Sequence, residues 1–240
     1  MDQSSEHARQ KAQNDLVLSY LAVRRAIGLL GFFLPVALAL YGLALGGLLP
    51  SMSAYFYSPM REIFVGTLCA QAVFLWSYEG YREPGRLLTD RLVARIAALS
   101  AALIGFAPSH PDGPLPDGSC TLLQCMLGPG ASANLHVLAV LGFFGALTVF
   151  CLVLFQRGTD DSPEGRAARR LYRICGWTII AAIAAIGLLL FTGLDERLAA
   201  LRPVFWLEAV ACFAFATSWT VKGRFLRPVL RMMAGPRGQS

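Results

Sequence analysis

The 240-residue chain has few charged residues and few histidines for its length. Charged side chains make up 15% of it, against about 25% in typical soluble domains. It also lacks a phosphate-binding loop, a G-x-S-x-G nucleophile motif and a kinase motif set. Three histidines without an H-x-x-x-H spacing predict no metal site, and no motif indicates a cofactor. These absences argue against a soluble enzyme of a recognisable motif class.

Long apolar runs are abundant instead. The chain is 55% hydrophobic, and its charges gather in short blocks between apolar runs of about 20 residues, the length that crosses a bilayer as a helix. A β-barrel would show alternating segments of about ten residues. We therefore predict an all-α polytopic membrane protein, a bundle of six transmembrane helices forming a single membrane domain over residues 1–240. The predicted spans are 27–49, 59–78, 92–107, 135–155, 174–194 and 204–221, flanked by a polar N-terminal tail (1–15) and a basic C-terminal tail (228–240).

Lysine and arginine are divided unequally between the two predicted sides. The side that holds both termini carries 18 of the 21, and the opposite side carries three, namely Arg61, Arg197 and Arg202. This bias predicts that both termini are cytoplasmic, in a multi-pass membrane protein. The net charge of +6 then reflects topology, so we expect membrane lipids and no nucleic acid as partners. Whether the chain forms a homo-oligomer or binds another membrane protein stays open.

Residues 51–66 combine hydroxyls, aromatics and charges beside a predicted span. The hydroxyl-bearing residues alternate with apolar ones, and they are Ser51, Ser53, Tyr55 and Tyr57. Their period predicts an extended segment with one polar face, folded over the mouth of the bundle. An aromatic belt at headgroup level is the simpler alternative for the tyrosines. Ser58-Pro59 then predicts the start of a helix.

Four charged or titratable residues are predicted on the same outer side. Glu208 lies about 7 Å inside the last span, where an ionisable group is costly and is a candidate functional residue. Arg61 could pair with Glu208 or bind an anionic head group. Glu62 could have no role beyond stabilising the N-terminus of its helix through the helix dipole. His136 begins the fourth span and could equally be a hydrogen-bonded structural residue. The outer loop also holds Cys120 and Cys125, for which an oxidising compartment predicts a disulfide.

Three sequence features together resemble a known family. They are the run Ser51–Gly66, the Leu135-His136 pair, and the W-L-E-x-x-A-x-x-x-F-A-x-S-W-x-V-K-G pattern of Trp206–Gly223. They are similar to uncharacterised bacterial six-span inner-membrane proteins, loosely the DUF998 and Frag1-like group. The resemblance implies a polytopic fold in the bacterial inner (plasma) membrane and no established activity. It points to the same residues, Ser51, Ser53, Tyr55, Tyr57, Arg61, Glu62, His136 and Glu208.

These candidates lead to three interpretations. The first is a polar, outward-facing pocket between the starts of spans 2, 4 and 6, which binds a lipid head group or another small anionic or zwitterionic ligand. The second is a membrane-embedded hydrolase in which Ser51 or Ser53 is the nucleophile, with His136 as base and Glu208 orienting it. The third is a structural or assembly subunit without a ligand of its own.

Overall fold

The structure is a computed structural model that describes residues 3–80, 85–111, 120–157 and 159–224. Six long helices dominate it, and they are α1 (Gln3–Tyr41), α2 (Arg61–Trp76), α3 (Asp90–Phe106), α5 (Pro129–Val149), α6 (Pro163–Thr192) and α8 (Pro203–Lys222). The short elements are η1 (Gly42–Gly46), η2 (Ser53–Tyr57), α4 (Leu122–Leu127), η3 (Phe150–Leu154), α7 (Leu194–Arg197) and η4 (Ala199–Leu201). The all-α prediction is confirmed. The predicted polar tail is helical from Gln3, and the basic tail lies outside the described residues.

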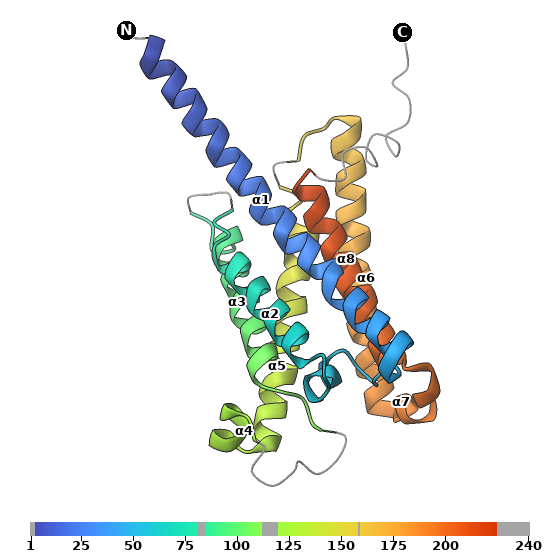
Figure 1. The fold of residues 1–240 in the computed structure, drawn as a ribbon. Coiled ribbons are helices and arrows are strands. Elements are labelled where there is room, and N and C mark those ends of the chain that lie inside the picture. The colour runs from blue at the N-terminus through green and yellow to red at the C-terminus, as the bar shows by residue number, and fades with distance from the viewer. Residues whose placement is uncertain (1–2, 81–84, 112–119, 158, 225–240) are drawn as a thin grey trace.

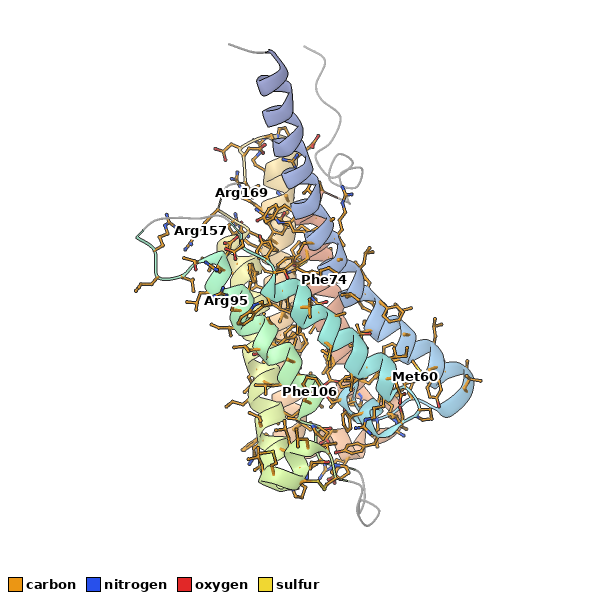
Figure 2. All side chains as sticks on the ribbon, turned by 60° about the vertical axis from the view of Figure 1, so that its left-hand side comes forward. Met60, Phe74, Arg95, Phe106, Arg157 and Arg169 are labelled. Atoms are coloured by element: carbon orange, nitrogen blue, oxygen red, sulfur yellow. A yellow bond between two sulfur atoms is a disulfide. The ribbon has the colours of Figure 1, made fainter. Side chains whose placement is uncertain are left out.

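The six long helices form a closed antiparallel ring. Each packs against the next along the chain, and α8 returns to pack against α1 (Figure 1). We call the end where α1, α3 and α6 begin the N-terminal end, and the end that holds η2, α4 and α7 the far end. Figure 2 shows Arg95, Arg157 and Arg169 toward the N-terminal end, with Met60 and Phe106 toward the far end.

Among the described residues, four segments are long and apolar enough to cross a membrane, and they are Tyr20–Gly46, Pro129–Leu154, Pro163–Thr192 and Ala199–Lys222. The chain is therefore a multi-pass membrane protein. The other two long helices are shorter, because α2 has 16 residues and α3 has 17. At 1.5 Å per residue they are about 24–26 Å long. Each of the six predicted spans overlaps one long helix.

Small and aromatic residues shape the interior. Trp219 on α8 is fully buried, and its ring centroid lies 5.0 Å from those of Tyr78 and Phe150 in edge-to-face contacts, each of which contributes about 0.5–1.5 kcal/mol. Gly28 lets α1 approach α8 closely, since a Cβ there would lie 2.5 Å from Cγ2 of Thr220. A larger residue at Gly28 would force the two helices apart.

The segment before α2 differs from its prediction. Ser53–Tyr57 forms a 3-10 helix, so the extended segment predicted from the alternation is wrong. The reason is burial, because the adjacent Tyr55 and Phe56 are 0% and 4% exposed, and an extended strand would point neighbours to opposite faces. Ser58 Oγ accepts from Met60 N at 3.1 Å, and α2 begins at Arg61, slightly later than predicted.

Candidate functional site at the far end of the bundle

The segment from Pro50 to Tyr57 is anchored on the start of α8. Phe205 N donates to Pro50 O at 3.1 Å, and Oε2 of Glu208 accepts from Met52 N at 2.5 Å. A carboxylate that accepts a backbone N–H forms a strong, charge-assisted hydrogen bond. Glu208 therefore holds the segment in place. Within the described residues it forms no ion pair with Arg61, so the suggested pairing of these two side chains is wrong.

Ser53 and His136 are in direct contact. Nε2 of His136 lies 2.8 Å from Oγ of Ser53, and Nδ1 lies 2.7 Å from Ala107 O. A carbonyl oxygen can only accept, so Nδ1 carries a proton, and in the neutral ring Nε2 accepts from the Ser53 hydroxyl. Both side chains are buried, at 7% and 4% exposure. Ser53 therefore lies beside a neutral base, His136, whose ring is oriented by the carbonyl of Ala107. The hydrolase interpretation had assigned that orienting role to Glu208.

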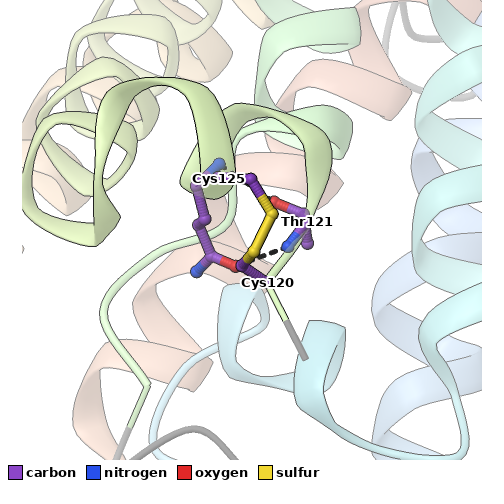
Figure 3. Close-up of a disulfide and its surroundings, with 4 residues drawn as sticks. Cys120, Thr121 and Cys125 are labelled. Carbon is purple, nitrogen blue, oxygen red and sulfur yellow. Dashed lines mark hydrogen bonds between the residues drawn. A yellow bond between two sulfur atoms is a disulfide. The ribbon is translucent and has the colours of Figure 1, made fainter. Parts of the chain in front are cut away.

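Tyr57 connects the segment to α4. Its hydroxyl donates to Ser109 O at 2.8 Å and accepts from Nε2 of Gln124 at 2.9 Å. Gln124 also accepts from Thr121 N, which completes a capping box at the start of α4. The chain there is closed by a disulfide between Cys120 and Cys125, whose Cα atoms lie 5.4 Å apart (Figure 3). Tyr57 thus holds α4 beside η2, and the disulfide closes the first turn of α4 on itself.

Two tyrosines of this region, the buried Tyr55 and the more exposed Tyr57, favour their neutral forms. Tyr55 is fully buried against Phe205, and this burial raises its pKa, although the N–H of Leu49 opposes the shift. Burial likewise raises the pKa of Tyr57, and the hydrogen bond from Gln124 opposes it. Desolvation disfavours the phenolate in both cases. Ionising either residue would therefore weaken the folded segment.

A groove of about 680 Å³ opens between α2, α3 and α4. Its polar lining comes from Thr121 and from the exposed side chains of Arg61 and Glu62. Its remaining wall is mostly apolar, formed by Phe56, Val65, Gly66, Leu103, Gly105, Phe106, Leu122 and Leu123. The Arg61 guanidinium lies 4.4 Å from the centre of the Phe56 ring. The groove therefore joins one cation and one anion to a long apolar surface.

The eight predicted site residues do not line one pocket. Arg61 and Glu62 line the groove, whereas Ser53, His136 and Glu208 form the contacts that hold the segment. Ser51 accepts from Ala54 N at 3.1 Å and borders a separate hollow of about 360 Å³ beside α7. Sequence reasoning missed Gln124 and the α3 and α4 walls of the groove. The capping-box pattern of Thr121 and Gln124 was a signal that could have indicated α4.

A second polar cluster lies at the N-terminal end. Nη2 of Arg24 donates to the hydroxyls of Tyr20 and Tyr78, at 2.6 and 2.9 Å, and Tyr78 donates to Oδ2 of Asp90 at 3.3 Å. Lys222 Nζ donates to Phe155 O at 3.3 Å. The sequence did not single out Arg24 or Asp90, yet they are only 3% and 8% exposed. This cluster joins α1, α3 and α8 and has no counterpart in the predictions.

Comparison with known proteins agrees with the resemblance seen in the sequence. The family described as "Protein of unknown function (DUF998)" matches residues 60–213. This match covers α2 through about half of α8, and it includes Arg61, Glu62, His136 and Glu208 but not Ser51–Tyr57. No curated protein and no solved structure matches the chain. The chain belongs to the DUF998 family of proteins of unknown function.

Proposed function

We propose that the protein spans the bacterial inner membrane six times and binds a membrane lipid in the groove between α2, α3 and α4. The head group occupies the end with Arg61 and Glu62, and an acyl chain lies along the apolar wall. The observation that carries this proposal is the joining of a cation, an anion and a long apolar surface in one groove. The ligand is a zwitterionic lipid such as phosphatidylethanolamine.

The topology rests on the packing of α2 and α3. They lie in the ring between α1 and α5, two helices with membrane-spanning length. Their outward side chains are apolar, for example Val73 at 64% and Leu99 at 57% exposure. Such faces suit hydrocarbon, so α2 and α3 cross the same bilayer. The arginine bias puts both termini in the cytoplasm, and the groove then opens on the outer side.

The chemistry of the groove fits a zwitterionic head group. A guanidinium can bind a phosphate with two parallel hydrogen bonds, and a neighbouring carboxylate attracts an ammonium. Arg61 and Glu62 follow each other at the start of α2, so their side chains fan out from one turn. Two glycines deepen the apolar wall, and a Cβ on Gly66 would meet no atom within 4 Å. That space can hold a methylene chain.

The experiment is lipid retention by the purified protein, measured by native mass spectrometry with added phosphatidylethanolamine. We expect Arg61→Ala to weaken binding about 10-fold or more, the range for hydrogen bonds to charged groups. Gly66→Leu should fill the groove and abolish retention, whereas Gly66→Ala is the matched control and should bind normally. Undiminished retention in Arg61→Ala and Gly66→Leu would overturn the proposal and favour a structural subunit.

A second candidate function is hydrolysis by Ser53. The 2.8 Å contact between Ser53 and His136 supports it, since an adjacent base activates a serine hydroxyl. The test is covalent labelling by a fluorophosphonate probe in detergent. Labelling of the wild type that Ser53→Ala removes and Ser51→Ala retains would establish this activity. Absence of labelling in the folded wild type would reject it.

A further inference from the structure

The first turns of α6 carry a second amphiphilic surface, at the opposite end from the groove. Arg166, Arg169, Arg170 and Arg173 line a concavity of about 790 Å³ together with Ile174 and Trp177. The apolar part of the helix extends from Ile174 to Thr192, which is about 28 Å at 1.5 Å per residue and matches the hydrocarbon thickness. Arg170 and Arg173 therefore lie at headgroup level, with Trp177 one turn deeper.

The four arginines differ in their protein contacts. Arg169 donates to Thr159 O at 2.9 Å and to Oδ1 of Asp161 at 2.5 Å, and Arg166 donates to Asp161 O. These bonds fix the first two arginines against the loop before α6. Arg170 and Arg173 are exposed, and neither has a hydrogen bond or ion pair among the residues described. They are three positions apart, so they lie on one helix face.

Trp177 and Ile174 extend this face into the apolar region. They are 62% and 57% exposed, which places an indole directly below two available guanidinium groups. Tryptophan is enriched where hydrocarbon meets head groups because its ring is apolar and its N–H is polar. A phosphate bound by the arginines would have its acyl chains beside Trp177 and Ile174. A soluble anion could use the arginines but not the apolar half of the surface.

We infer that this face of α6 is a binding site for an anionic phospholipid, with the phosphodiester between Arg170 and Arg173 and the acyl chains against Trp177. The site is independent of the lipid groove at the far end. The excess of positive charge selects an anionic head group such as phosphatidylglycerol. The groove, with one cation and one anion, has no such excess.

The first experiment titrates phosphatidylglycerol into the purified protein and counts bound lipid by native mass spectrometry. Arg170→Ala with Arg173→Ala should weaken binding about 30-fold, since each arginine near an anionic surface contributes about 1 kcal/mol. Arg91→Ala with Arg197→Ala removes the same charge from exposed positions elsewhere and should bind normally. Equal weakening in both double variants, or none in the first, would overturn the inference.

A second experiment locates the lipid at Trp177. In nanodiscs of phosphatidylethanolamine and phosphatidylglycerol, bromine is placed on the acyl chains of one lipid at a time. At matched mole fraction, we expect brominated phosphatidylglycerol to quench tryptophan fluorescence more strongly than brominated phosphatidylethanolamine does. Trp177→Phe should abolish this excess quenching by phosphatidylglycerol. Trp206→Phe, at the far end of the bundle and 42% exposed, should keep the excess. An excess that survives Trp177→Phe would contradict the site.

Discussion

Nε2 of His136 lies 2.8 Å from Oγ of Ser53, and this contact joins α5, about two turns after its start, to the segment before α2. The same imidazole donates through Nδ1 to Ala107 O, just beyond α3. One buried side chain thus connects three parts of the chain, with both ring nitrogens used. The contact positions η2, and therefore Phe56 and the entrance of the groove.

The first prediction concerns this contact. Ser53→Ala leaves Nε2 of His136 buried without its partner, which should lower the free energy of unfolding by about 1–3 kcal/mol. Ser51→Ala loses a hydrogen bond to Ala54 N at a more accessible site and should cost about 1 kcal/mol or less. Thermal unfolding of the purified variants in detergent provides the comparison. Equal stability of the two variants would show that the histidine contact contributes little.

The second prediction separates a structural Glu208 from a ligand-binding one. Glu208→Ala removes the acceptor of Met52 N and should destabilise the protein by about 1.5–3 kcal/mol. Glu208→Gln keeps an oxygen acceptor at the same position and should lose less than half of that. Phosphatidylethanolamine retention by Glu208→Gln should equal that of the wild type. A stable Glu208→Gln protein that no longer binds lipid would instead place Glu208 in the binding site.

The sequence predicted the long helices well because apolar length is a one-dimensional signal. Thr89 and Ser162 also cap α3 and α6 as their residue types predict. Contacts between distant elements were not predictable in this way. Glu208 seemed a partner for Arg61 because both are charged and lie on one side, yet the nearer backbone N–H of Met52 satisfies it. Arg24 was not singled out because Tyr78 comes from another segment, which no spacing reveals, and only its other partner, Tyr20, lies one turn earlier on α1.

The third prediction tests whether the disulfide and Tyr57 shape the groove. Tyr57→Phe removes the hydroxyl that bonds Ser109 O and Gln124, so α4 should become less firmly held. We expect Tyr57→Phe to weaken phosphatidylethanolamine retention although Arg61 is still present. Adding Cys120→Ser and Cys125→Ser should weaken this retention further. Met126→Ala on α4, 69% exposed, is the control and should bind normally. Retention unaffected by these three changes would show that α4 does not form part of the site.

The fourth prediction concerns pH. The pKa of Tyr55 is raised in the folded state above its ordinary value of about 10. At pH values between these two pKa values, the hydroxyl of Tyr55 is deprotonated in the unfolded chain only. Stability should therefore fall as the pH rises above about 10. Tyr55→Phe should show a shallower fall than the wild type over the same range. Parallel curves of unfolding temperature against pH for the two proteins would contradict this role.

The fifth prediction compares two adjacent arginines on α1. Arg24 is buried and bonded to Tyr20 and Tyr78, so Arg24→Met leaves Asp90 buried with less compensating charge and should cost about 3–5 kcal/mol. Arg25 is exposed and donates to Gly223 O at 3.2 Å, and Arg25→Met should cost about 1 kcal/mol or less. Both variants remove one positive charge from the same turn, so a difference in unfolding temperature reports burial and not topology. If Arg25→Met were the more damaging, the cluster around Arg24 would not be what holds α1 to α3 and α8.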